Sequence, residues 1–104
     1  MRFVAAITLA LIVASPAAWA GSARVTIKDY MFQPSTLTIT AGTKVVWTNQ
    51  DQVAHTVKSS DAMAPFASAP LEAGQRFSYT FAKPGTYHVI CAIHPYMKET
   101  ITVR

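Results

Sequence analysis

The chain has 104 residues, nine of them Lys or Arg and five Asp or Glu, so its formal net charge is +4 at pH 7. The basic residues are scattered and form no cluster with interleaved aromatic residues, which argues against nucleic-acid binding. One cysteine cannot close a disulfide within the chain, so in an oxidising compartment its thiol must be buried, paired with another chain or bound to a metal.

The first twenty residues have the pattern of a cleaved secretory signal. Arg2 gives a positive start, residues 3–13 are almost continuously apolar, and Ala18-Trp19-Ala20 is a small-x-small cleavage pattern. The apolar run is shorter than the about 20 residues that a membrane span requires. We therefore expect a signal peptide over residues 1–20, one domain over residues 21–104, export to the periplasm and no stable membrane insertion.

The first half of this domain predicts four short strands. Val25 and Ile27 alternate with polar neighbours, which predicts a strand over residues 24–30. Pro34 interrupts the pattern, and further strands are expected over residues 37–40, 44–49 and 53–58, because these segments are rich in β-branched and aromatic residues. Residues 59–70 contain two prolines and no clear period, so we expect a loop there, with a short edge strand near Phe66.

The second half predicts three more strands, over residues 75–81, 86–91 and 98–104. Tyr87 follows the turn Lys83-Pro84-Gly85, as in the tyrosine corner of β-sandwiches. Roughly seven or eight short strands, with no amphipathic helix, predict an all-β fold in the form of an antiparallel β-sandwich.

Three soft or borderline metal ligands recur at regular spacing near the C-terminus, in Cys91-Ala92-Ile93-His94-Pro95-Tyr96-Met97. A trigonal site of two histidines and one thiolate, with a weak axial methionine, is the ligand set of blue-copper electron-transfer centres. Taken singly, Cys91 would be an inert buried thiol and Met97 a core residue. A structural zinc site fits less well, because methionine is not among its usual ligands.

The second histidine of such a site has two candidates. Along its strand, His88 lies on the face opposite to Cys91 and cannot easily turn to the same metal. His55 comes from a distant stretch that follows the strand carrying Trp47, as a rigid site at one end of a sandwich requires. We therefore expect the metal ligands to be His55, Cys91, His94 and Met97.

These motifs together resemble the cupredoxins, and the likeness extends over essentially all of residues 21–104. The segments that carry it are Phe32-Gln33-Pro34, AGTKVVWTN at residues 41–49, His55-Thr56-Val57, Pro84-Gly85-Thr86-Tyr87 and Cys91-x-x-His94-x-x-Met97. The short spacing of the last segment is similar to that of the amicyanins. The resemblance implies a Greek-key β-sandwich or barrel with one type 1 copper, cycling between Cu(II) and Cu(I), bound by the four residues named above.

Two features depart from the family pattern. Thr56 stands where many members have Asn after the first ligand histidine, and residues 59–70 form a shorter loop than in the amicyanins. The family's hydrogen bonding around the thiolate and its choice of partner are therefore not carried over unchanged.

The resemblance also implies a function. The protein would be a monomeric one-electron carrier, not an enzyme, and would meet exported redox partners transiently, for example a periplasmic dehydrogenase and a cytochrome. His94 would lie at the surface among Pro65, Phe66, Pro95 and Tyr96, and it would leave Cu(I) on acidification. The alternative is an exported copper carrier without electron transfer. Three histidines are too few for an additional copper centre of an oxidase or reductase.

Overall fold

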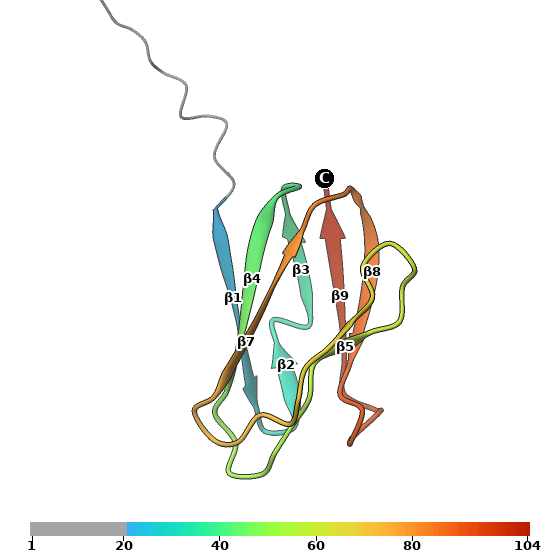
Figure 1. Ribbon diagram of the computed structural model, residues 1–104. Helices are drawn as coiled ribbons and strands as arrows, with labels where there is room; N and C mark the ends of the chain where they lie inside the picture. Colours follow the sequence, from blue (N-terminus) through green and yellow to red (C-terminus); the bar gives the residue numbers. More distant parts are fainter. Residues whose placement is uncertain (1–20) are drawn as a thin grey trace, which may run out of the picture.

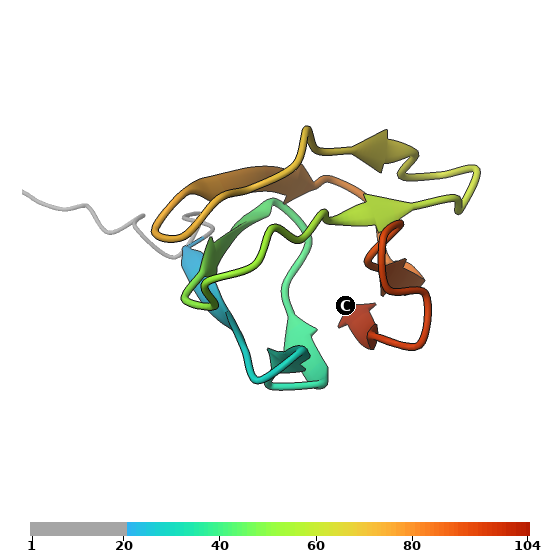
Figure 2. The ribbon, with the colours of Figure 1, turned by 90° about the horizontal axis from the view of Figure 1, so that it is seen from below.

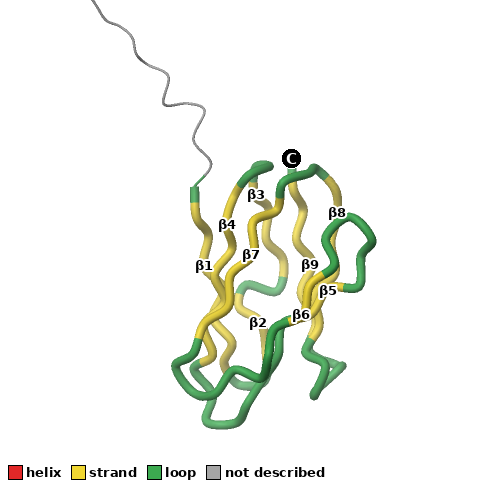
Figure 3. The backbone as a smooth tube through the Cα atoms, viewed as in Figure 1, coloured by secondary structure: helices red, strands yellow, loops and turns green. Residues whose placement is uncertain are grey.

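The computed structural model describes residues 21–104, and the predicted signal peptide lies outside the described residues. The described part is all-β, as Figures 1 and 3 show. Its strands are β1 (Ser22–Lys28), β2 (Met31–Gln33), β3 (Thr36–Ile39), β4 (Thr43–Asn49), β5 (Lys58–Ser59), β6 (Phe66–Ala67), β7 (Arg76–Phe81), β8 (Gly85–Ile90) and β9 (Lys98–Val103). The predicted fold class is confirmed, β6 is the short edge strand expected near Phe66, and the strand that was not expected is the very short β2.

The strands form two sheets that enclose the core, as the view along the strands in Figure 2 shows. One sheet has the order β2-β1-β4-β7 and the other β3-β9-β8-β5-β6. The prediction of an antiparallel sandwich is wrong for two strand pairs, because β1 pairs with β4 and β3 with β9 in parallel. The chain passes from one sheet to the other between β2 and β3 and back again at β4, which brings strands of the same direction together.

The predicted strand over residues 24–30 ends early, at Lys28. Asp29 and Tyr30 both have left-handed backbone conformations, with φ of 54° and 59°. Such values are uncommon for residues other than glycine, and they turn the chain sharply so that β2 folds back on β1. The sequence did not reveal this turn, because the alternation of Val25 and Ile27 stops at Asp29 with no glycine or proline to mark a turn there.

The predicted strand over residues 53–58 is also wrong for most of its length. Only Lys58–Ser59 pairs as a strand, while His55 forms an isolated bridge with Leu71. The side-chain amide of Asn49, at the end of β4, donates hydrogen bonds to the backbone carbonyl oxygens of Val53 and Leu71 at 2.9 and 2.8 Å. These bonds hold the segment as a loop against the end of the sandwich.

Alternating side chains of both sheets fill the core. Val45 and Trp47 of β4 and Val89 of β8 are fully buried, in agreement with the period of two expected for strands with one face toward the core. The Tyr87 hydroxyl donates a 2.7 Å hydrogen bond to the carbonyl oxygen of Lys83, which confirms the predicted tyrosine corner.

One carboxylic acid is buried in this core. The side chain of Glu99 in β9 points inward, and its Oε1 accepts a 2.8 Å hydrogen bond from the Trp47 indole N–H in the other sheet. Its Oε2 has no hydrogen-bond partner among residues 21–104. Burial raises the pKa of Glu99 to about 7, although the Trp47 bond opposes this effect.

The connections that follow β1, β4, β6 and β8 gather at one end of the sandwich, the lower end in Figure 1. The C-terminus lies at the opposite end. Residues far apart in the sequence therefore meet at the lower end. Among the described residues, no helix is long and apolar enough to cross a membrane.

Replacing Tyr87 with Phe tests the tyrosine corner. The variant loses the hydroxyl that pairs with the Lys83 carbonyl group, so we expect the free energy of unfolding to fall by about 1 kcal/mol. Urea unfolding followed by tryptophan fluorescence measures this change. Y79F is the control, because Tyr79 is only partly buried; equal effects of Y87F and Y79F would contradict the role of this bond.

Replacing Glu99 with Gln tests the buried acid. Between the ordinary pKa of 4.5 and the raised value of about 7, the folded state holds a proton that the unfolded chain has released. The contribution of Glu99 to stability therefore falls as pH rises through this window, by about 2–3 kcal/mol between pH 5 and 8.

In E99Q this pH dependence is expected to vanish, because the amide does not ionise. Urea unfolding of both proteins at pH 5 and 8 measures the difference, with the exposed Glu72→Gln as the control. Parallel pH profiles of wild type and E99Q would show that Glu99 does not hold its proton in the folded state.

Candidate metal centre

Cys91 lies directly after β8, on the buried side of that strand. Tyr87, Val89 and Cys91 are all buried, while the intervening His88 is exposed, as the predicted alternation requires. The following loop is closed by two backbone hydrogen bonds. The backbone N–H of Met97 donates to the carbonyl oxygen of His94 at 2.9 Å. The backbone N–H of Cys91 donates to the carbonyl oxygen of Met97 at 3.3 Å.

His55 reaches the same end of the molecule from the loop after β4. Its backbone N–H donates to the carbonyl oxygen of Leu71 at 3.1 Å, and its own carbonyl oxygen accepts from the Leu71 N–H at 2.7 Å. The His55 side chain is fully buried. The backbone pairing thus fixes the position from which the imidazole points toward Cys91.

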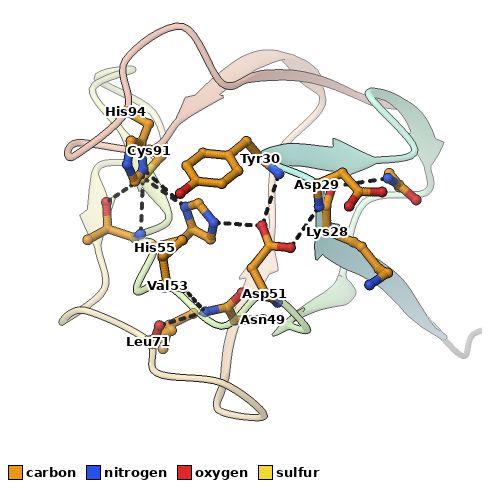
Figure 4. Close-up of polar contacts among 12 residues, drawn as sticks. Lys28, Asp29, Tyr30, Asn49, Asp51, Val53, His55, Leu71, Cys91 and His94 are labelled. Carbon is orange, nitrogen blue, oxygen red and sulfur yellow. Dashed lines mark hydrogen bonds and ion pairs between the residues drawn. The ribbon is translucent and has the colours of Figure 1, made fainter.

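The side chains of His55, Cys91 and His94 converge, as Figure 4 shows. The Nδ1 atoms of the two histidines are 3.2 Å apart, and Cys91 Sγ lies 3.8 Å from Nδ1 of His55 and 3.7 Å from Nδ1 of His94. The three predicted donors, separated in sequence by up to 39 residues, form a small triangle.

The size of this triangle fits a metal ion. Bonds of about 2.0–2.1 Å to nitrogen and about 2.3 Å to sulfur, the values typical of zinc, would separate the donors of a trigonal site by about 3.6 Å between nitrogens and about 3.8 Å between nitrogen and sulfur. The distances between the donor atoms lie close to these values, and two imidazoles with one thiolate form a donor set that suits copper.

The other two candidates occupy different environments. The Met97 side chain is buried at the end of the ligand loop. His88 lies outside the triangle, on the exposed face of β8, with its Nδ1 3.8 Å from a carboxylate oxygen of Asp61. The structure therefore separates the two candidate histidines as strand parity predicted.

Thr56 supports the thiol from the neighbouring loop. Its backbone N–H donates a 3.3 Å hydrogen bond to Cys91 Sγ, and its hydroxyl oxygen accepts a 2.7 Å bond from the Ala92 N–H. Burial raises the pKa of Cys91, but the Thr56 N–H and the two imidazoles favour the thiolate more strongly and lower the pKa to about 6. The Thr56 hydroxyl thus ties the ligand loop to the loop that carries His55.

Asp51 is a site residue that the sequence analysis missed. Its carboxylate lies 2.8 Å from His55 Nε2 and accepts hydrogen bonds from the backbone N–H groups of Asp29 and Tyr30 at 2.7 and 2.9 Å. Burial raises the pKa of Asp51, but these hydrogen bonds together hold it below the usual value. An ionised carboxylate can only accept, so the ring nitrogen that faces it, Nε2, is the donor, and Nδ1 is the nitrogen left to bind a metal.

Tyr30 is the second residue that was missed. Its ring lies edge-on to both imidazoles, with centroids 5.1 Å from His55 and 4.9 Å from His94. Asp51 lies four residues before His55 in a polar loop, and this spacing was a visible signal in the sequence for a contact between the two side chains. No comparable signal marked Tyr30, because its position depends on an unusual turn.

The surface around His94 differs in part from the expected patch. Tyr96 is exposed, with its ring centroid 6.1 Å from that of His94, and Ile93 is exposed beside it. Phe66 instead packs against Trp47 and Tyr79 as part of the aromatic cluster on the core, so its assignment to the exposed patch is wrong.

Comparisons with known proteins agree with this geometry. A family model described as a cupredoxin-like domain matches residues 2–103. Amicyanin-alpha of Methylorubrum extorquens is 39% identical over 87 residues, which cover 81% of this chain and 73% of that protein.

Two solved structures are similar as well. The purple cupredoxin from Nitrosopumilus maritimus is 33% identical with a TM-score of 0.71, and the match covers 79% of this chain and 99% of that one. The Cu(I) form of an amicyanin variant is 27% identical with a TM-score of 0.76, and covers 85% and 88% of the two chains. With a matching family model, a related sequence and the same fold, the chain belongs to the cupredoxin-like family.

Proposed function

We propose that this protein is an exported one-electron carrier with a single type 1 copper bound by His55, Cys91, His94 and Met97. The observation that carries the proposal is the triangle of Nδ1, Nδ1 and Sγ, with sides of 3.2, 3.7 and 3.8 Å. Copper bound there supplies a one-electron change between Cu(II) and Cu(I). The Cys91 thiolate, the imidazoles of His55 and His94 and the thioether of Met97 would hold the metal.

The surroundings of the donors favour electron transfer over metal delivery. His55 and Cys91 are fully buried, and backbone or side-chain hydrogen bonds hold each of them. Donors held in this way change little between oxidation states, and they release a metal slowly. A copper carrier needs ligands that a partner can reach and exchange, so the alternative function is less well supported.

The exposed surface beside His94 suits brief contacts with a redox partner. Ile93 and Tyr96 are exposed to 49% and 67%, next to the half-buried His94. A small apolar patch around one ligand permits close approach without a large interface, as transient redox encounters require. We propose that the protein acts as a monomer and that its partners, for example a dehydrogenase and a cytochrome, are periplasmic.

The visible spectrum of the copper-loaded protein tests the metal site. We expect an intense charge-transfer band from thiolate to Cu(II), which disappears on reduction. C91S is expected to abolish the band, because serine cannot supply the sulfur, and M97L to shift it while keeping its intensity. H88Q is the matched control and should leave the spectrum unchanged, since His88 lies on the exposed face of β8.

A colourless oxidised wild-type protein would refute the copper site, and loss of the band in H88Q would refute the ligand assignment. Electron self-exchange and copper release then separate the two functions. We expect fast self-exchange and slow release of copper to a chelator. Slow self-exchange with rapid release would instead establish a copper carrier.

Replacing Asp51 with Asn tests how the carboxylate supports the site. Asn has only one acceptor oxygen for the three donors that Asp51 serves, so at least one of them loses its partner. We expect copper affinity to fall by about 10–100-fold, the usual cost of removing such support from a metal-bound histidine. Competition with a coloured Cu(I) chelator measures the affinity.

D61N is the matched control, because the Asp61 carboxylate accepts a backbone bond from His88 outside the metal site. It should leave copper affinity unchanged. Equal affinities of D51N and wild type would show that Asp51 does not act through His55.

A further inference from the structure

The turn between β1 and β2 is conformationally strained at two adjacent residues. Asp29 and Tyr30 both have φ near +55° to +60°, values that Asp adopts more readily than Tyr. An unfavourable backbone conformation at a bulky residue persists only where its surroundings compensate for it. The position of Tyr30 therefore requires an explanation in the contacts around it.

The compensation comes from Asp51. Its two carboxylate oxygens accept one hydrogen bond each from the backbone N–H groups of Asp29 and Tyr30, at 2.7 and 2.9 Å. One of these oxygens also lies 2.8 Å from His55 Nε2. The same carboxylate thus holds the turn and one imidazole.

The turn in its strained form places the ring of Tyr30 on the metal centre. The ring meets His55 at an interplanar angle of 87° and His94 at 74°, both in edge-to-face geometry. In Figure 4 the ring extends from the turn toward the two imidazoles, with its hydroxyl end on their side. Tyr30 is the ring that contacts both of them, although one comes from the loop after β4 and the other from the loop after β8.

One side of this ring is open. Tyr30 is 38% exposed, and a cleft of about 540 Å³ borders the turn, lined also by Met31, Tyr96 and Met97. Because the cleft side is open, the ring is held by the turn and by its contacts with the two imidazoles.

We propose that Tyr30 is a positioning residue that, with Asp51, clamps the imidazoles of His55 and His94 in the geometry that binds copper. The clamp rests on the proposed copper site. Asp51 orients His55 through Nε2, while the Tyr30 ring restrains both rings from the side. His94 has the greater need of this restraint, because it is half-buried and lies in an exposed loop.

Two substitutions at Tyr30 separate the ring from its hydroxyl group. Y30F keeps the ring, and Y30N removes it while using a residue that tolerates the left-handed backbone. Y30G is a second ring-free variant in case Y30N does not fold. M31N is the control, because Met31 is the exposed neighbour on the same cleft.

The rate of Cu(I) release to a chelator and the electron paramagnetic resonance spectrum of the Cu(II) form are measured for each variant. We expect Cu(I) release to be on the order of tenfold faster in Y30N, because two aromatic contacts are lost. We also expect the copper hyperfine splitting of the Cu(II) form to change in this variant. Y30F and M31N should match wild type. Unchanged release and spectrum in Y30N would overturn the clamp, and so would a Y30F variant that behaves like Y30N.

A second measurement keeps this test apart from that of the copper site. In the metal-free protein, side-chain relaxation in nuclear magnetic resonance should show a more mobile His94 ring in Y30N than in wild type or Y30F. If wild-type protein lacks the charge-transfer band, the proposed function fails, yet this measurement still decides the clamp. Equal mobility of His94 in Y30N and wild type would overturn the clamp even where the band is present.

Discussion

The buried carboxylate of Asp51 is the interaction on which the metal end of the sandwich depends. It accepts hydrogen bonds from the β1–β2 turn and bonds His55 from its own loop, so it joins two connections that are distant in sequence. Without an acceptor there, two backbone N–H groups and one imidazole N–H would lose their hydrogen-bond partner in a largely buried environment. Each such loss lowers the stability of the folded protein by about 1–3 kcal/mol. The carboxylate determines both where His55 points and how the turn is shaped.

Thr56 and Asn49 extend the same principle to the other connections. Asn49 joins the segments around Val53 and Leu71, and Thr56 joins the ligand loop to the loop of His55. Hydrogen bonds of these polar side chains thus hold the loops together, while alternating apolar side chains hold the two sheets together. The same hydrogen bonds hold the three candidate metal donors close together before any metal binds, so binding does not have to order these side chains at a cost in conformational entropy. A site prepared in this way suits a carrier whose ligands should not rearrange.

Much of the site could be predicted because it depends on local rules. Strand parity separates His88 from Cys91, and the regular spacing of Cys91, His94 and Met97 requires only a tight loop. Tyr30 escaped prediction because no glycine or proline marks the turn at Asp29, and nothing in the sequence pattern indicates two left-handed residues. Phe66 was misplaced for a related reason. Hydrophobicity does not say whether an aromatic ring joins the core cluster or a surface patch.

By itself, the sequence determined the all-β fold class, the inward face of each long strand and the candidate donors, since these follow from periodicity and ligand chemistry. Only the tertiary structure decided the pairing of β1 with β4 and of β3 with β9, the loop around His55, the contact of Asp51 with His55 and that of Tyr30 with both imidazoles. The physical reason is that most of these features depend on contacts between segments distant in sequence, such as the hydrogen bonds from the Asp29–Tyr30 turn to Asp51 and the ring contacts of Tyr30 with His55 and His94. Such contacts leave no periodic trace in a single chain.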